Sequence, residues 1–288
     1  MTIDMLIGQV VIGISLAANL FLVASGLTII FGLLRLINFA HASLYALGAY
    51  FCFTVSGWTN NYWVGLASGC FATMILGAAI EIGLLRRIYK SEHILQLLLT
   101  FALILAFTDL TKLTWGAFPV TVQLPAALSG AVSFSGNPIP VYCFFLIGMG
   151  LAVGLGLYLF LYRTKWGAVI RTAAYDREMT SALGVNVPRL FTAVFILGAG
   201  LGGLGGGIAA PLTTIIPDMG MLIIIDSFAV IIIGGVGSLM GAAVGSLIIG
   251  IWGAIGLLIV PQFAMVFTFV LMGIILLIRP WGIFGEKF

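Results

Sequence analysis

Long runs of consecutive apolar residues constrain this chain more than any other feature of its sequence. Residues 191–210, FTAVFILGAGLGGLGGGIAA, and residues 269–278, FVLMGIILLI, contain no charged side chain. Strands of a membrane barrel alternate apolar and polar residues, and these runs do not alternate. Because lipid offers the backbone no hydrogen-bond partner, such runs cross a membrane as helices. Only 7% of the residues are charged, too few to cover a water-soluble domain.

The breaks between the apolar runs predict an all-α fold, a polytopic transmembrane helical bundle. A helix of about 20 residues crosses the ~30 Å hydrocarbon layer, so about eight to nine membrane segments fit. We take residues 1–288 as a single transmembrane domain. A complete set of nine crossings places the N-terminus outside; the count falls if 36–55 does not span, or if 221–236 and 241–259 are half-helices. The expected segments are 6–34 (with tilt or a break near Gly26), 36–55, 62–85, 94–115, 141–162, 190–211, 221–236, 241–259 and a last one ending at 278.

The distribution of charge orients these segments. Basic residues gather on the cytoplasmic side of membrane proteins. This rule places a short basic loop, at residues 86–93, on the cytoplasmic side. It places the C-terminal Arg279, Glu286 and Lys287 on the same side. The stretch 119–140 has no charged residue and is expected to be an exterior loop. The short basic loop consists of Arg86, Arg87, Lys90 and His93.

Residues 163–190 form the longest polar interval, and by the same rule they lie inside. Within this interval the sequence DREMTSAL predicts a short helix. Asp176 and Glu178 would stand in or next to its first turn, where the helix dipole favours negative charge, and Gly184 would end it. A short helix of this kind, held outside the lipid, is suited to contact another protein.

Catalytic and metal-binding patterns are missing from the sequence. It has no H-E-x-x-H, no G-x-S-x-G and no G-x-x-x-x-G-K-[ST] phosphate loop, and it has two histidines. We therefore expect a transport or binding subunit and not an enzyme, with no cofactor, metal or nucleic acid bound by this chain. Cys52, Cys70 and Cys143 are widely spaced in apolar surroundings, which is typical of reduced packing residues.

Glycines recur at every fourth position in two of the apolar regions. Small residues at this spacing let helix backbones approach closely in lipid. We interpret both series as helix-packing surfaces; a flexible hinge in a moving helix is the alternative. The two series are Gly198, Gly202 and Gly206, and Gly237, Gly241 and Gly245.

A few polar residues within the apolar runs are candidates for a translocation path, since polar groups inside a membrane usually serve a function. They are Asn38, His41, Ser43 and Asp226. Asn38 and His41 have a structural alternative, the satisfaction of backbone groups at a helix break. For Asp226 the alternative is to cap a helix that begins at Phe228.

Three other charged residues have structural interpretations. Asp109 and Lys112 stand one helical turn apart, so we expect them to pair on one face. Glu81 precedes two arginines near the inner interface, where we expect it to extend its carboxylate towards water and to need no functional role.

Three motifs resemble those of one family of membrane proteins. The sequence EMTSALG at 178–184 is similar to the E-A-A-x-x-x-G coupling motif of ABC-importer permeases, with Met179 and Thr180 replacing the two alanines. Residues 36–50, LINFAHASLYALGAY, resemble the I-N-F-A-H-G-E-x-x-x-x-G-A-Y signature of the branched-chain amino-acid permeases, with Ala42 and Ser43 in place of Gly-Glu. Residues 231–245 are similar to that family's glycine-rich V-x-G-G-x-G-S segment.

This resemblance implies a function in the bacterial inner membrane. The chain would be one permease of an alternating-access importer for hydrophobic or neutral amino acids, or for urea or amides. It would pair with a second permease, take solute from an external binding protein, and sit on two ATPase subunits that bind ATP and Mg²⁺. The resemblance assigns ATPase coupling to Arg171, Asp176, Arg177, Glu178 and Gly184.

A different class of protein, an ion-coupled secondary transporter, is the competing hypothesis. It needs ion ligands near the middle of broken helices, and only Asp226 and Asn38 are plausible ones. This hypothesis leaves the helix predicted at 176–183 without a role.

Overall fold

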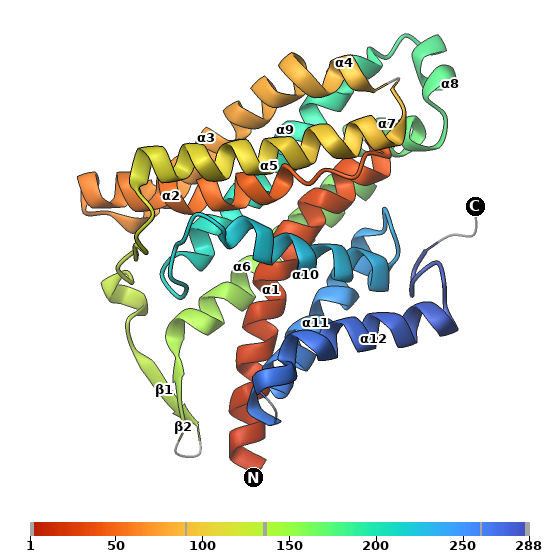
Figure 1. Ribbon diagram of the computed structural model, residues 1–288. Coiled ribbons are helices and arrows are strands. Elements are labelled where there is room, and N and C mark those ends of the chain that lie inside the picture. The colour runs from red at the N-terminus through yellow and green to blue at the C-terminus, as the bar shows by residue number, and fades with distance from the viewer. Residues whose placement is uncertain (1–2, 90, 135–136, 260, 286–288) are drawn as a thin grey trace.

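The computed structural model describes residues 3–89, 91–134, 137–259 and 261–285, and Figure 1 shows that most of them are helical. The helices are α1 Ile3–Leu34, α2 His41–Thr59, α3 Tyr62–Ile80 (continued by a π-helical turn Glu81–Leu85), α4 Arg86–Ile88, α5 His93–Trp115, α6 Val141–Arg163, α7 Lys165–Tyr175, α8 Arg177–Ala182, α9 Val187–Ala209, α10 Met219–Gly234, α11 Leu239–Ile259 and α12 Ala264–Ile278, with 3-10 turns at Ala126–Leu128 and Pro261–Phe263. Strands β1 Ala131–Phe134 and β2 Asn137–Pro140 complete the described elements.

The expectation of a polytopic helical bundle is confirmed. Among the described residues, 6 helices are long and apolar enough to cross a membrane: Leu6–Leu34, Tyr62–Ile88, His93–Trp115, Val141–Arg163, Val187–Ala209 and Leu239–Ile259. Two shorter apolar helices, Met219–Gly234 and Thr268–Ile278, accompany them. These helices account for six of the eight to nine predicted segments by length and composition, and the crossings expected at α2, α10 and α12 stay predictions.

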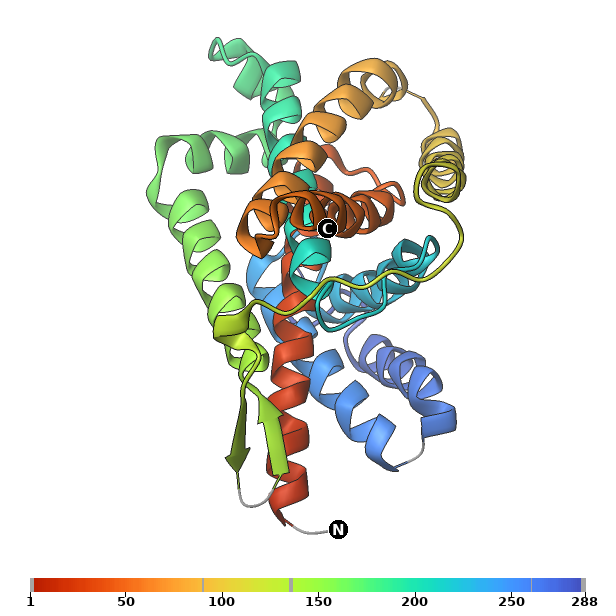
Figure 2. The same ribbon diagram turned by 90° about the vertical axis from the view of Figure 1, so that its left-hand side faces the viewer.

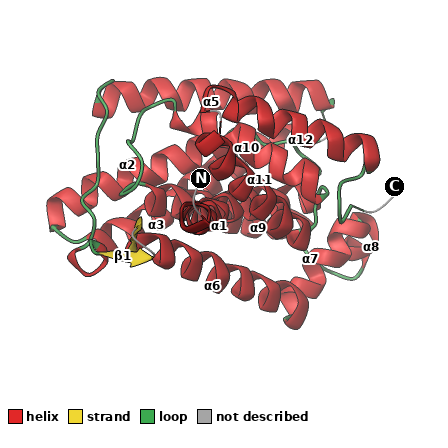
Figure 3. Ribbon diagram, turned by 90° about the horizontal axis from the view of Figure 1, so that it is seen from below, coloured by secondary structure: helices red, strands yellow, loops and turns green. Residues whose placement is uncertain are grey.

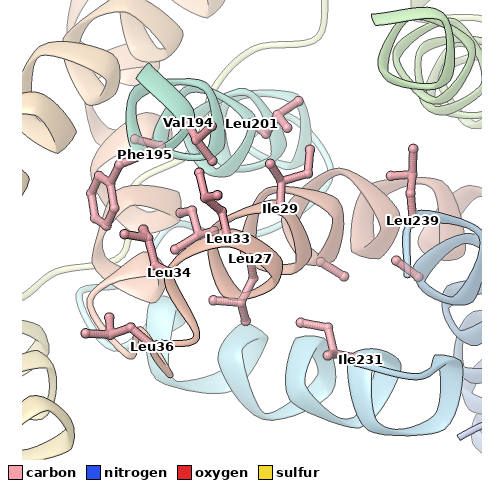
Figure 4. Close-up of a cluster of buried hydrophobic side chains, with 14 of the residues drawn as sticks. Leu27, Ile29, Leu33, Leu34, Leu36, Val194, Phe195, Leu201, Ile231 and Leu239 are labelled. Atoms are coloured by element: carbon pink, nitrogen blue, oxygen red, sulfur yellow. The ribbon is translucent and has the colours of Figure 1, made fainter. Parts of the chain in front are cut away.

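Helix α1 forms the centre of the bundle. It packs against α11, α9, α6 and α10, so elements distant in sequence share one apolar core. Figure 4 shows the α1 side chains Leu27, Leu33 and Leu34 directed towards side chains of α9 and α10. Leu27 and Leu33 are each 1% exposed. Burial of this kind explains why α1 is longer than a bilayer needs: it serves as the common packing surface.

The start of the chain differs from expectation at two places. α1 continues without a break through Gly26, which packs against the imidazole of His41. The other expectation for α1, a tilt in the membrane, stays a prediction. The next helix begins at His41 and not at Leu36, because Arg35 adopts a left-handed conformation (φ 51°) that ends α1. An irregular segment, 35–40, therefore connects the two helices. At the start of α2, the backbone N–H of His41 donates to Asn38 O at 3.3 Å.

The stretch expected to be a loop, 119–140, contains a small hairpin. β1 and β2 pair antiparallel, with Val132 opposite Ile139 and Ser133 opposite Pro138. Two prolines in β2 argued against a strand, but proline is tolerated at the edge of a sheet, and a hairpin of two strands has only edges.

The predicted basic loop is largely helical, because α3 continues through the π-helical turn into α4 and carries Arg86 and Arg87 on helix. A π-helical turn of this kind is frequent at functional sites. Lys90, Glu286 and Lys287 lie outside the described residues.

The glycine spacing predicts close packing correctly at five of the six positions. In α9, a side chain at Gly198 would meet Ile30 at 2.6 Å and one at Gly202 would meet His41 at 3.1 Å, while Gly206 lies against the backbone of Tyr45. In α11, Gly241 and Gly245 lie against the backbone of α10. Gly237 differs, because it stands in the turn before α11 and not on the helix. Its φ is +82°, a conformation that glycine adopts without strain, and an added Cβ would lie 3.5 Å from Gly32 of α1.

Candidate functional site

The polar interval folds into a protrusion of two short helices, α7 and α8, at one end of the bundle (Figure 1). We call residues 165–184 the α7–α8 protrusion. Asp176 Oδ1 accepts a hydrogen bond from Met179 N at 2.9 Å and so caps α8, and Gly184 follows α8 with φ +85°. The predicted short helix, with Asp176 at its start and a glycine stop, is confirmed. Sequence reasoning missed α7, although Thr164 signals its start by accepting from Gly167 N at 3.0 Å.

Two arginines attach the protrusion to the bundle. Arg177 Nη2 donates to Leu33 O at 2.9 Å, and its guanidinium lies 5.1 Å from the centre of the Phe191 ring. Burial lowers the pKa of Arg177, and the nearby charge of Arg35 lowers it further. Arg171 donates to Leu161 O and stacks over Tyr162 at 4.9 Å. Both side chains therefore hold α7 and α8 against the ends of α1, α6 and α9.

The outer surface of the protrusion carries apolar and aromatic side chains. Tyr175 is 92% exposed, Leu183 72% and Met179 58%. Glu178 is exposed beside them and Thr180 is buried beneath. Apolar side chains grouped on a polar element are characteristic of a protein-contact surface.

Glu81 joins α3 to α9 close to the protrusion. It is 0% exposed, and its carboxylate accepts hydrogen bonds from Arg86 Nη2 (3.1 Å), Tyr89 Oη (2.9 Å) and Thr192 Oγ1 (2.7 Å). The expectation that Glu81 extends towards water is wrong, because Arg86 and the two hydroxyls satisfy its charge inside the protein. Tyr89 also contacts Phe191, the ring beneath Arg177, at 5.5 Å between centroids. One set of contacts thus connects the Glu81 carboxylate to α8.

The candidate path residues at the start of α2 are buried. Asn38 and His41 are both 0% exposed, and His41 Nε2 lies 3.1 Å from Val23 O. Both polar side-chain atoms of Asn38, His41 Nδ1 and Ser43 Oγ have no hydrogen-bond partner among the described residues. Buried polar groups usually have partners, so this concentration of unpaired ones needs an explanation.

The interpretation of Asp226 as a helix cap is wrong. α10 begins at Met219, which places Asp226 within the helix, where it is half-buried. The apolar sequence before Asp226 continues the helix, so there is no start for it to cap.

The expected pair of Asp109 and Lys112 is present, and a third residue joins it. Lys112 Nζ lies 3.7 Å from Asp109 Oδ1 and also 3.7 Å from Asp218 Oδ1, just before α10. Sequence spacing indicated the first contact, but only the fold brings Asp218 to the end of α5.

Among the residues that the structure describes, no group of three or more His, Cys, Asp or Glu side chains is placed to hold a metal ion. Cys52, Cys70 and Cys143 are free thiols, two of them buried.

These features define a class of protein, a polytopic helical membrane protein with a polar protrusion at one end. The chain belongs to the family described as the permease component of the branched-chain amino acid transport system, whose model matches residues 9–278. This confirms the resemblance carried by the three sequence motifs.

Two full-length relatives support this membership. The chain is 27% identical to the high-affinity branched-chain amino acid transport system permease protein LivH of Escherichia coli, over 95% of this chain and 94% of the relative. It is 28% identical to the corresponding permease BraD of Pseudomonas aeruginosa, over 96% and 95% of the two chains. A shorter match, 30% identical over 41% of this chain and 34% of the relative, is to the fructose import permease FrcC of Rhizobium meliloti. No solved structure matches.

Proposed function

We propose that this chain is a permease subunit of an ATP-driven importer for branched-chain or other neutral amino acids in a bacterial inner membrane. It forms the translocation path with a second, related permease, receives solute from an external binding protein, and is driven by two ATPase subunits that bind ATP and Mg²⁺. The names of its full-length relatives support the solute class. Asn38, His41, Ser43 and Asp226 are the candidate path residues.

One observation carries the coupling part of the proposal: the α7–α8 protrusion is anchored on its inner side and apolar on its outer side. Tyr175, Met179 and Leu183 face outward, whereas Arg177 binds Leu33 O and Phe191. A partner can shift a conformational equilibrium only through contacts that differ between its states, and these reach the membrane helices only through a firm attachment. Asp176 and Gly184 shape α8, Arg171 and Arg177 anchor the protrusion, and Glu178 contributes charge to the contact surface.

If the chain were an ion-coupled transporter, the exposed apolar side chains of the protrusion would have no partner protein to contact. A permease of the same family for urea or amides remains the alternative within the class, and it differs only in solute.

The test is uptake by proteoliposomes that contain the complete importer. We expect uptake of leucine or a related amino acid to require ATP. Met179→Asp and Leu183→Asp should abolish uptake and stop the ATPase subunits from copurifying, because each places a charge on the contact surface without disturbing the core. Arg87→Gln, at an exposed position on α4, is the matched control and should behave as wild type.

Two outcomes decide against parts of the proposal. Uptake by this chain alone, driven by an ion gradient and unchanged in both protrusion variants, would establish the secondary-transporter class. ATP-dependent uptake of urea or amides without any uptake of amino acids would correct the solute.

A further inference from the structure

Helix α5 has a polar inner face, the reverse of a soluble helix. Its buried residues are Gln96, Thr100, Ile104 and Thr111, so three of the 4 are polar. Its outer face is apolar over the stretch before Asp109, and Leu105, 52% exposed, is representative. Figures 2 and 3 show α5 set at the edge of the bundle. The Thr100 and Thr111 hydroxyls donate to Leu97 O at 3.1 Å and to Phe107 O at 2.7 Å, which leaves each hydroxyl oxygen able to accept a further hydrogen bond.

A seam separates this polar face from α2 and the start of α10. It is too narrow here to admit a water molecule. Its lining consists of Ser43 and Ala46 of α2, Ile104, Phe107, Thr108 and Thr111 of α5, and Pro217 and Gly220. None of the described residues that line it is charged. Ser43 is 4% exposed and its Oγ has no partner among the described residues. We call this space the α2–α5 seam.

Polar contacts close the seam at the end of the molecule opposite the α7–α8 protrusion. Lys112 on α5 reaches Asp218 at 3.7 Å, and Trp115 Nε1 donates to Thr54 Oγ1 of α2 at 2.7 Å. The Lys112–Asp218 pair is exposed, 41% and 66%, so it contributes little to stability and can open at low cost.

We propose that the α2–α5 seam is the part of the shared solute path that this subunit contributes, closed in this structure, with Ser43, Thr108 and Thr111 as its solute-facing residues and Lys112–Asp218 as its outer closure. The proposal rests on the function proposed above. Hydroxyl groups beside Phe107, without ionised side chains, fit a solute of zero net charge with both hydrogen-bonding groups and an apolar part. A zwitterionic aliphatic amino acid has this chemistry.

The first experiment replaces Ser43 with alanine. Removing a buried hydroxyl that has no partner leaves nothing unsatisfied, so Ser43→Ala should fold with an unchanged melting temperature. In the complete importer, with saturating binding protein, we expect leucine uptake per ATP hydrolysed to fall about fivefold to tenfold, the effect of one lost hydrogen bond to solute. An unchanged ratio of uptake to hydrolysis overturns the role of Ser43.

The second experiment tests whether the seam opens. Thr108→Cys should react with a charged, membrane-impermeant thiol reagent during ATP turnover, and 10 mM leucine, about a saturating amount for a weak transient subsite, should slow the reaction. Leu105→Cys, one turn away on the apolar face of α5, should stay unlabelled. Mass spectrometry of the labelled peptides separates these sites from the three natural cysteines.

Cross-linking tests the outer closure. Treatment of the double variant Lys112→Cys/Asp218→Cys with a short bifunctional thiol reagent should stop uptake. The same treatment should not block uptake by either single variant.

The outcomes separate the two proposals. If the wild-type complex shows no ATP-dependent uptake, the proposed function is overturned and the proposed solute route is overturned with it. Wild-type uptake with Thr108→Cys unlabelled in every nucleotide state, or with cross-linked importer still active, overturns the α2–α5 seam alone.

Discussion

The carboxylate of Glu81 accepts a hydrogen bond of 2.7 Å from the hydroxyl of Thr192, 111 residues later in the chain. This bond joins the π-helical turn after α3 to the first turns of α9, next to the α7–α8 protrusion. A buried carboxylate held by Arg86, Tyr89 and Thr192 fixes α3 to α9 at this junction.

Substitution of Thr192 tests this junction. Thr192→Val keeps the shape of the side chain and removes the bond to Glu81, so we expect a loss of about 1 kcal/mol of unfolding free energy. Glu81→Gln should destabilise more, because it also removes the ion pair with Arg86. Thermal unfolding in detergent measures both, with Thr192→Ser as the control that retains the hydroxyl. Equal stability of Thr192→Val and Thr192→Ser would contradict a structural role for the bond.

Arg177 tests the anchoring of α8. Arg177→Ala removes the charged hydrogen bond to Leu33 O and the contact with Phe191, and we expect amide exchange in residues 176–184 to accelerate about tenfold, with global stability little changed. Glu178→Gln, exposed on the same helix, is the matched control. Exchange that is identical in Arg177→Ala and wild type would show that other contacts hold α8.

Gly202 tests the close approach of α9 to α2. A Cβ there would lie 3.1 Å from His41 Cε1, so Gly202→Leu must displace the imidazole or separate the helices, at a cost of about 1–3 kcal/mol. Gly148→Leu should be tolerated, because a Cβ added at Gly148 would meet no described atom of another segment within 4 Å. The yield and melting temperature of purified protein measure the difference. Equal behaviour of the two variants would refute the packing interpretation.

Substitution of Asp226 tests whether a carboxylate within an apolar helix serves transport. Asp226→Asn removes a half-buried charge from α10, and we expect an equal or higher melting temperature together with reduced ATP-dependent uptake, because intramembrane carboxylates are retained for function. Asp109→Asn, at an exposed position, is the control and should change neither quantity by much. Unchanged uptake by Asp226→Asn would remove this residue from the path.

Local chemistry explains why much of the fold was predictable. The span expected at 94–115 appears as His93–Trp115 and that at 141–162 as Val141–Arg163, because continuous apolar sequence in lipid has no alternative to helix. The cap at Asp176 and the stop at Gly184 were also predictable, since both depend on a few adjacent residues.

Contacts between distant segments were not predictable. Glu81 was expected to reach water, and its partner Thr192 follows it by 111 residues. The structural alternative for Asp226 was to cap a helix, and it lies within one. The seam joins residues of α2, α5 and α10, and neither spacing nor composition places them together.

The sequence by itself determined the membrane environment, the helical class, the short capped helix and the family motifs, because each depends on composition or on neighbouring residues. Tertiary structure alone decided that Arg177 turns inward to Leu33, that Lys112 bridges to Asp218, and that Ser43 faces α5 without a partner among the described residues. The physical reason is that the energy of a buried polar group depends on which atoms the fold brings within hydrogen-bonding distance.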